Sequence, residues 1–353
     1  MTLKFSIYSE LQSWPGKSYE ALYGEVLEQI ENADRLGYDA YAVIEHVFFP
    51  KFSASANVFG LFGMAASRTR RIKLRTMLHV LPYHNPLVLA AMIHEFSLLT
   101  GGRYEFGVGR GHGWVPLAAG LPLDESSRPR YEEALELFVE AIEHESVSFS
   151  GRYFEVANSQ IVPFSGHRFR VILGGTSDQT YDLAARHGWG VAVPPLLPYS
   201  ALKGQLDLYR DRCAEYGTSP DIVWIHACYL DEDREVALRE AERHLRGFLA
   251  GNASPLTDHP ALPADRLAAA GYGFYSSGIM EQLAATPYDE MIAKDIVWCG
   301  TPEDVVQRVQ ETIDVCPGLT EVAITANPGG ADHWKAIKAQ ELFAAHVIPK
   351  FSP

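Results

Sequence analysis

Eight short, apolar, strand-like segments alternate along this chain with segments in which apolar residues recur every three or four positions. The predicted strands are Lys4–Ser9, Ala40–Ile44, Ile72–Val80, Arg103–Val108, Arg170–Leu173, Gly190–Val193, Ile222–Leu230 and Glu321–Thr325. Such alternation predicts a parallel sheet whose helices pack outside it. Because the chain has 353 residues and no detectable linker or repeat, the economical fold is an α/β (β/α)8 TIM barrel. The competing doubly wound sheet would more often divide into two domains at this length.

Two segments interrupt the alternation of strands and helices. Val147–Pro163, with alternating aromatic residues and a Ser-Gly turn, indicates a β-hairpin before the fifth strand. Residues at about 250–296 form an irregular insertion after the seventh strand, marked by Pro and Gly. We therefore expect a single barrel domain over residues 1–353. The helices are predicted at Tyr19–Leu36, Asn57–Ser67, Pro86–Leu99, Arg130–Glu143, Asp178–His187, Tyr199–Tyr216, Glu232–Leu249, Pro302–Val315 and Asp332–His346.

Charge and cysteine content restrict the class of protein. The net charge of −14 at pH 7 argues against nucleic acid and anionic membranes as partners. The four cysteines form no C-x-x-C pair, which favours a reducing compartment over a disulfide scaffold or a zinc site. No apolar run approaches membrane-spanning length, and the first residues lead directly into a strand. These features predict a soluble cytoplasmic protein.

The segment Gly101–Gly113 is rich in glycine and contains the fourth predicted strand. Just beyond that strand, Arg110 stands between two glycines. Glycine lets the backbone approach a ligand closely, and the planar guanidinium of arginine suits phosphate or carboxylate. The spacing does not match the dinucleotide pattern G-x-G-x-x-G, and taken alone the motif favours a tight turn with a solvated arginine.

The predicted barrel makes a ligand-binding role of Arg110 more plausible than a solvated turn, because the carboxyl ends of barrel strands form the active face. Arg110, His46, His79 and the loop Gly174–Ser177 would then converge on one mouth. The loop also precedes a predicted helix, and amides and hydroxyls at the start of a helix make an anion site. Simple helix capping is the alternative for its hydroxyl residues.

Three further groups of residues occur in a characteristic order. They are Gly37–Tyr41 with Glu45-His46; Leu81–Pro86 with Gly101–Arg103 and Gly107–Gly111; and Cys299–Glu303 with Glu341–Ala344 and Val347–Pro349. In this order and spacing the chain resembles the bacterial luciferase-like, flavin-dependent oxidoreductase family. The resemblance covers nearly the whole chain and is weakest in the hairpin and in the insertion. The fold of that family is a (β/α)8 barrel, in agreement with the strand count.

The resemblance implies a flavin cofactor, usually reduced FMN and in some branches the deazaflavin F420. It places the phosphate pocket at Arg110 and in the loop that contains Gly175, Thr176 and Ser177, with Thr180 in the helix that follows.

The resemblance also implies a non-prolyl cis peptide in the third strand, beneath the flavin ring. This bond corresponds to Met77-Leu78.

His46 is the predicted catalytic residue, because its counterpart in the family lies beside the reactive edge of the flavin. An imidazole that titrates near neutral pH can exchange a proton with the oxygenated flavin or with a substrate. The alternative is a histidine that is only hydrogen-bonded at a strand end, for example to Glu45.

No metal is expected, because His79, His84 and His112 share no tight ligand spacing and have no acidic partner placed beside them. Two positions depart from the family pattern. Val47 stands where many relatives have a second histidine, and Gly109 replaces the reactive cysteine of true luciferases, which argues against light emission. Further candidates for the pocket lining are Glu10, Trp14, His112, Trp114 and the segment Gly271–Tyr275.

The resulting hypothesis is a monooxygenase that uses reduced FMN and O2 to oxidise a small organic substrate. Since no nicotinamide-binding domain is evident, a separate flavin reductase would supply the reductant. The alternatives are an F420-dependent oxidoreductase on the same barrel and a non-catalytic flavin-binding protein. We also expect a homodimer through Asn57–Ser67 and Leu87–Leu99, which are apolar almost all round.

Overall fold

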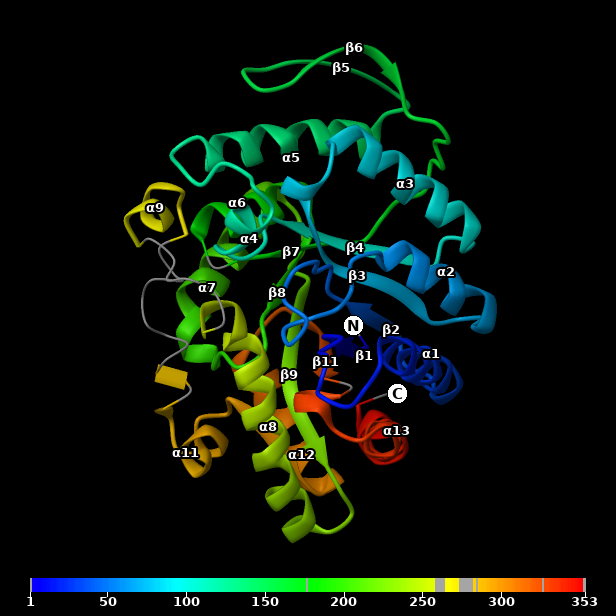
Figure 1. Ribbon diagram of the computed structural model, residues 1–353, viewed down its shortest axis with the longest axis vertical. Helices are drawn as coiled ribbons and strands as arrows, with labels where there is room; N and C mark the ends of the chain where they lie inside the picture. Colours follow the sequence, from blue (N-terminus) through cyan, green and yellow to red (C-terminus); the bar gives the residue numbers. More distant parts are fainter. Residues whose placement is uncertain are drawn as a thin grey trace.

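The strands of the computed structural model form the expected closed barrel (Figure 1). The structure describes residues 2–175, 177–257, 264–272, 282–283, 285–325 and 327–351. The barrel strands, in spatial order, are β1 (Lys4–Ser9), β2 (Ala40–Val43), β3 (Lys73–Val80), β4 (Tyr104–Gly109), β7 (Val171–Gly174), β8 (Gly190–Val193), β9 (Ile222–Leu230) and β11 (Leu319–Thr325). Every neighbouring pair is parallel, and β11 pairs with β1 to close the ring.

Helices surround the strands, and their ends follow local sequence signals. The Ser18 hydroxyl accepts the backbone N–H of Ala21 at the start of α1, and Gly37 ends that helix with a φ of 97°. Thr301 and Asp304 form a capping box at the start of α12. The outer helices are α1 (Tyr19–Leu36), α2 (Val58–Arg68), α3 (Pro86–Leu99), α5 (Ser127–Glu143), α6 (Asp178–His187), α7 (Tyr199–Tyr216), α8 (Arg234–Thr257), α12 (Pro302–Val315) and α13 (His333–Leu342).

Shorter elements fill the connections. They are η1 (Leu81–Tyr83), α4 (Val115–Ala118), α9 (Ala264–Ala269), α11 (Tyr288–Ala293), η3 (Pro328–Gly330), the π-helical turn η4 (Phe343–Val347) and η5 (Ile348–Lys350). None of the helices in the described ranges combines the length and the apolar character needed to cross a membrane.

The two predicted interruptions are present, with corrected limits. The antiparallel hairpin of β5 (Ser146–Ser150) and β6 (Glu155–Gln160) projects beyond α5 and α3 (Figure 1). The insertion is not irregular from residue 250, because α8 continues to Thr257. It also ends in a strand that the sequence analysis missed: β10 (Val297–Gly300) pairs with the second half of β9, outside the ring.

Five charged residues lie together at the amino-terminal end of the barrel, which we call the ion network: Arg75, Glu105, Arg170, Asp221 and Glu321. Arg75 is 1% exposed and donates from Nε to Oε2 of Glu105 at 2.9 Å and from Nη2 to Oε2 of Glu321 at 3.0 Å. Burial opposes the charge on Glu321, but the guanidinium groups of Arg75 and Arg170 lower the pKa of this carboxyl well below its usual range. The ion network therefore holds the strand starts together as an ionised cluster.

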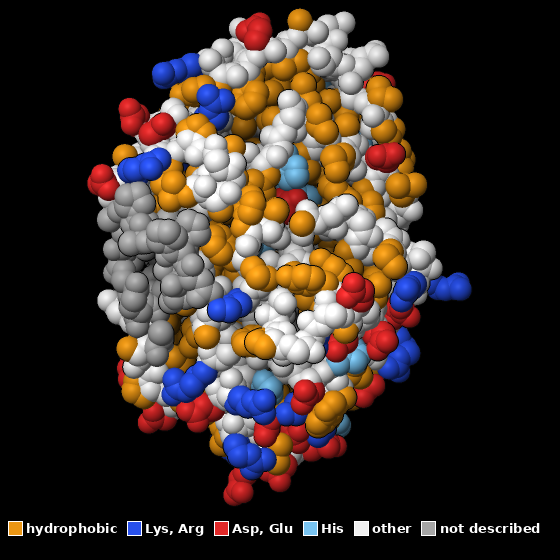
Figure 2. Space-filling model, viewed as in Figure 1, with side chains coloured by type: hydrophobic (Ala, Val, Ile, Leu, Met, Phe, Trp, Pro, Cys, Tyr) orange, Lys and Arg blue, Asp and Glu red, His pale blue; other side chains and the backbone are white. Residues whose placement is uncertain are grey.

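The exposed apolar side chains of the outer layer are concentrated on α3. Val88, Met92, Leu98 and Leu99 are 57%, 37%, 47% and 75% exposed, whereas α2 contributes Met64 at 52%. Val88 and Met92 line a groove between α3 and the hairpin. In Figure 2, hydrophobic side chains gather in the upper part of the face, over the region of α3 and α5, and charged side chains gather in the lower part.

Candidate active site

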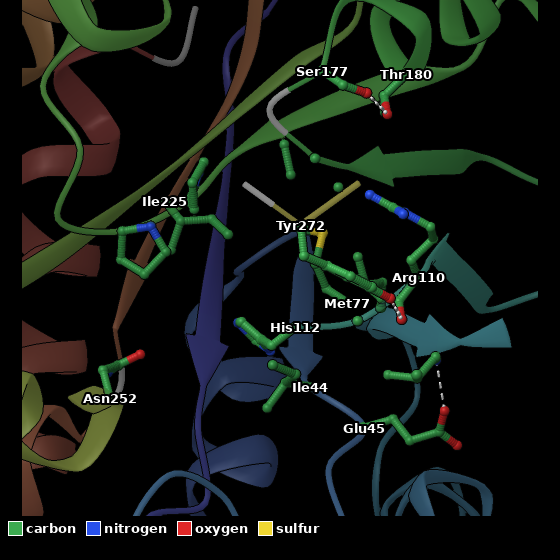
Figure 3. A pocket seen from close by; sticks show the side chains of 18 of the residues that line it. Ile44, Glu45, Met77, Arg110, His112, Ser177, Thr180, Ile225, Asn252 and Tyr272 are labelled. Atoms are coloured by element: carbon green, nitrogen blue, oxygen red, sulfur yellow. Dashed lines mark hydrogen bonds between the residues drawn. The ribbon is translucent and has the colours of Figure 1, made fainter. Parts of the chain in front are cut away.

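A cavity of about 300 Å³ opens at the carboxyl ends of the barrel strands (Figure 3). Its walls combine apolar strand residues with a few charged and hydroxyl side chains, which is the usual composition of a small-molecule site. The apolar residues are Ile44, Phe52, Met77, Leu78, Val80, Ile172, Ala192, Leu196, Leu197 and Ile225. Two groups of polar residues, described next, lie on opposite sides of the cavity, and further polar residues, among them Glu45 and His112, line it as well.

The first group, the anion end, consists of Arg110, Arg128, Ser177 and Thr180. The hydroxyls of Ser177 and Thr180 lie 3.0 Å apart, and the Ser177 side chain does not cap α6. The Thr180 N–H donates to the Ser177 carbonyl oxygen at 2.9 Å, so the N–H groups of Asp178 and Gln179 are those at the start of α6 that an anion from the cavity could use. A side chain at Gly175 would place its Cβ 3.0 Å from Oγ1 of Thr180, so the loop needs glycine to pass this close. Thr176, also predicted here, lies outside the described residues.

Arg110 is held against the insertion rather than free in solvent. Its Nη1 and Nη2 donate to the carbonyl oxygens of Ala270 and Gly271 at 2.9 and 2.7 Å, and its guanidinium lies 4.2 Å from the ring centroid of Tyr272. Figure 3 shows the side chain extending toward the side of the cavity where Ser177 and Thr180 lie. The structure thus brings Arg110, Gly175, Ser177 and Thr180 to one wall, as the sequence predicted.

The glycines before Arg110 serve the barrel interior. A Cβ at Gly107 would lie 2.5 Å from the carbonyl oxygen of Ile172 and 3.1 Å from Cβ of Leu78, and one at Gly109 would lie 3.0 Å from Cδ2 of Leu78. Hence Gly107 makes room for the backbone of Ile172 and for Leu78, and Gly109 makes room for Leu78. The peptide bond between Met77 and Leu78 is cis, as the resemblance implied, and both side chains line the cavity.

The second polar group, the Glu10 group, consists of Tyr8, Glu10 and Asn252. Oε1 of Glu10 accepts from the Tyr8 hydroxyl at 3.1 Å, and Oε2 accepts from Nδ2 of Asn252 at 3.0 Å. Burial raises the pKa of Glu10 to about 8 and outweighs the lowering by these two hydrogen bonds. Burial therefore favours the protonated form of Glu10 at neutral pH. Asn252 lies across the cavity from Ser177 and Thr180 (Figure 3).

His46 lies behind the cavity wall and is 1% exposed. Its ring centroid is 4.5 Å from that of Phe52, and its Nε2 accepts from Nε1 of Trp114 at 3.3 Å. An indole N–H can only donate, so Nε2 carries no proton and the imidazole is neutral with its proton on Nδ1. The pKa of His46 also indicates a neutral imidazole, because burial and the nearby His112 lower it to about 3. The expectation that His46 titrates near neutral pH is therefore wrong.

His112 is the histidine that faces the cavity. Its ring stacks on Trp114 with centroids 4.4 Å apart and an interplanar angle of 4°, and it lies 4.9 Å from the Phe52 ring. Burial lowers the pKa of His112 to about 4, so it too is neutral in the working range. His112, Trp114 and Phe52 form an aromatic wall between His46 and the cavity.

The expectation that His79, His84 and His112 have no acidic partner is wrong for two of them, because Glu45 lies beside His79 and His84. Glu45 follows β2, and its Oε1 and Oε2 are both 3.0 Å from Nε2 of His84. Its Oε1 is also 3.6 Å from Nδ1 of His79. The residues are far apart in sequence but meet because the carboxyl ends of adjacent parallel strands share one edge. Glu45 contacts these two histidines and not His46.

Two residues of the site were missed or ranked low. Arg128 begins the first turn of α5 and donates to Glu132 at 2.8 Å at the cavity wall, but nothing in its local sequence marks it as a ligand-binding residue. Glu10 follows β1 directly, and an acidic residue at the carboxyl end of a barrel strand was the available signal.

Comparison with known proteins agrees with this geometry. The family model described as luciferase-like monooxygenase matches residues 3–315. A 5,10-methylenetetrahydromethanopterin reductase of Archaeoglobus fulgidus is 26% identical over 335 residues, which cover 93% of this chain and 96% of the relative.

Two solved structures share the fold over essentially the whole chain. The monooxygenase RslO1 from Streptomyces bottropensis has a TM-score of 0.81 at 23% identity, covering 99% of this chain and 100% of its own. The oxygenating constituent of the 3,6-diketocamphane monooxygenase of Pseudomonas putida, a type II Baeyer-Villiger enzyme in complex with FMN, has a TM-score of 0.78 at 20% identity and 99% coverage of both chains. Relatives include monooxygenases as well as F420-dependent reductases and dehydrogenases, so an oxidoreductase is supported. The chain belongs to the luciferase-like monooxygenase family.

Proposed function

We propose that this protein is a flavin-dependent monooxygenase that binds reduced FMN and oxidises a small organic substrate with O2. The observation that carries the proposal is a cavity with guanidinium and hydroxyl groups at one end and apolar barrel residues in its middle. A flavin mononucleotide has the matching distribution, with a phosphate at one end and a flat, largely apolar ring at the other.

The anion end would hold the phosphate. Arg110 and Arg128 supply positive charge, while the hydroxyls of Ser177 and Thr180 and the open amides of α6 supply hydrogen bonds. The ring would lie against Met77 and Leu78. Bound reduced flavin supplies the two electrons that the reaction with O2 requires.

The remaining polar groups have roles set by their protonation. Glu10 keeps its proton at neutral pH, so it can donate a hydrogen bond or a proton to a substrate oxygen on its side of the cavity. His46 lies behind the cavity wall, where its neutral imidazole accepts from Nε1 of Trp114 and orients that indole. The aromatic wall of Phe52, His112 and Trp114 in turn limits water at the reacting end.

A separate reductase would supply the electrons. The strands in the described part of the chain belong to the barrel, to the hairpin β5–β6 or to β10. They leave no second sheet there for a nicotinamide dinucleotide.

An F420-dependent hydride transfer is the second candidate, favoured by Glu10. A carboxylic acid that stays protonated beside a ligand cavity can deliver the proton that accompanies a hydride. In that case O2 would take no part in the reaction.

Anaerobic titration of the purified protein with reduced FMN and with reduced F420 separates the two candidates. We expect saturable binding of reduced FMN and, after mixing with 18O2 and a panel of ketones and medium-chain aldehydes, one labelled oxygen atom in the product. Tight binding of F420 without binding of FMN, or product free of label, would reject the monooxygenase.

A further inference from the structure

Glu45, His79 and His84 place three potential metal ligands together at the carboxyl ends of β2 and β3. We call these residues the Glu-His-His cluster. One ligand atom from each lies within 4.8 Å of the other two. Glu45 follows β2, His79 is the penultimate residue of β3, and His84 comes directly after η1. The cluster thus connects the ends of two neighbouring strands. It lies beside the cavity, and Glu45 lines the cavity wall but His79 and His84 do not.

The separations of the donor atoms suit a small ion. Nε2 of His84 is 3.0 Å from each oxygen of Glu45, and Nδ1 of His79 is 3.6 Å from Oε1. In a tetrahedral zinc site with bonds of about 2.0–2.1 Å, the donors are about 3.3 Å apart. Two of the three separations therefore lie on either side of this value, and the third, between His79 and His84, is at most 4.8 Å.

His79 is the most deeply buried of the three residues and presents its Nδ1 to Glu45. Its side chain is fully buried, and its Nδ1 has no hydrogen-bond partner among the described residues. Nε2 of the same ring lies 2.7 Å from the hydroxyl of Tyr104, which in turn lies 2.7 Å from Oγ1 of Thr76. This chain lets Nε2–H donate to Tyr104, and then the lone pair of Nδ1 faces the carboxylate of Glu45. A cation between Nδ1 and the carboxylate stabilises this tautomer, whereas the tautomer with its proton on Nδ1 donates to Glu45; metal binding would therefore select the first.

The surrounding contacts fit a metal ligand set. Ligating histidines commonly donate their second N–H to an oxygen, as His79 can to Tyr104. Oε2 of Glu45 accepts the backbone N–H of Val80 at 2.8 Å, which leaves Oε1 for an ion. Two imidazoles and one carboxylate, with water in the remaining position, are a donor set that zinc accepts.

We infer that Glu45, His79 and His84 bind one divalent transition-metal ion, and that zinc is the ion that best suits this set. The site is separate from the anion end and from the Glu10 group, and it does not depend on which flavin the protein uses. Its occupancy would fix the ends of β2 and β3 relative to each other.

Zinc binding to the full-length, chelator-treated protein tests this inference. The variants are His84→Gln, which alters the most exposed ligand, and His144→Gln as a matched control. His144 also faces a carboxylate, with Nδ1 3.4 Å from Oε2 of Glu140, but no third donor from the described residues completes that pair.

We expect calorimetry and metal analysis to give one zinc per chain for the wild type and for His144→Gln. His84→Gln should bind at least tenfold to a hundredfold more weakly, since even the outer partners of ligating histidines contribute that much. Zinc should raise the melting temperature of the first two proteins and leave that of His84→Gln unchanged. Absence of stoichiometric zinc in the wild type, or equal affinity in His84→Gln, would overturn the inference.

Cobalt provides a readout that does not depend on a variant that folds. Co²⁺ bound to the wild type should shift the N–H proton resonances of two imidazoles outside the normal NMR range. Shifted signals that disappear on addition of zinc support the site, and their absence at saturating Co²⁺ rejects it.

Discussion

The guanidinium of Arg110 lies 4.2 Å from the ring centroid of Tyr272 and ties the mouth of the barrel to the insertion. A residue that follows β4 is thereby joined to one that follows α9. Its charge remains on the cavity wall and is the basis of the first prediction.

Arg110→Ala should weaken FMN binding by about tenfold to a hundredfold, because a charge-assisted hydrogen bond contributes roughly 1.5–3 kcal/mol. Riboflavin, which has no phosphate, should bind the variant and the wild type alike in fluorescence titrations. Arg186→Ala, which removes a surface partner of Asp182, is the control. Equal losses for FMN and riboflavin would mean that Arg110 acts through the insertion and not through the phosphate.

Glu10→Gln should flatten the pH dependence of stability between pH 5 and 8. The pKa of Glu10 is raised from its ordinary value of 4.5 to about 8 in the folded protein, so unfolding releases a proton in this window. Wild-type stability therefore falls as pH rises, whereas glutamine mimics the protonated acid at every pH. Calorimetric melting temperatures measure the slope, with surface Glu290→Gln as the control. Parallel slopes for wild type and Glu10→Gln would show that Glu10 is ionised at neutral pH.

His46→Phe should lower turnover by about tenfold, because the Trp114 N–H loses the acceptor that orients the aromatic wall, at a cost of about 1–3 kcal/mol. The pH profile should keep its shape, because the pKa of His46 is about 3 and the residue stays neutral across the assay range. His46→Gln, whose amide oxygen can still accept from Nε1 of Trp114, should retain more activity. Steady-state kinetics from pH 5.5 to 9 check both points. An inflection near pH 6.5 that vanishes in the variants would restore His46 as a titrating group.

The apolar face of α3 should be the centre of a homodimer interface. Val88 and Leu99 are 57% and 75% exposed, and monomeric proteins rarely leave so much apolar surface uncovered. Sedimentation should give a dimer for the wild type and a monomer for the double variant Val88→Glu, Leu99→Glu. Trp334→Glu on α13, also exposed, should stay dimeric. A monomeric wild type at micromolar concentration would contradict the prediction.

The barrel was predictable because each of its strands is apolar and is followed by a helix with its own start and stop signals. Ser18, Gly37 and Thr301 act at the predicted ends. The strand β10 was missed, because the eight barrel strands already complete the alternation and β10 pairs with β9 outside the ring. The Arg110 wall was predicted from the position of Arg110 at the carboxyl end of a barrel strand and from the family resemblance, because its glycine-rich neighbours alone favoured a solvated arginine.

The missed features of the site depend on contacts between distant residues. Only the packed barrel shows that Gly107 and Gly109 accommodate Leu78. Likewise, the neutral state of His46 depends on Trp114, and the approach of Glu45 to His84 depends on the pairing of β2 with β3. Protonation states and ligand clusters are three-dimensional properties that a linear pattern does not carry.

The ion network lies at the opposite end of the strands from the cavity, which gives the protein two independent pH limits. Glu321 and Asp221 have lowered pKa values, so the stability they contribute is present at neutral pH and is lost only as acid protonates them. At the other end, alkali removes the proton of Glu10. Acid therefore weakens the ion network at the amino-terminal end of the barrel, whereas alkali deprotonates Glu10 at the cavity. Residues at the cavity can therefore be substituted to suit high pH without changing the ion network that sets the stability of the protein in acid.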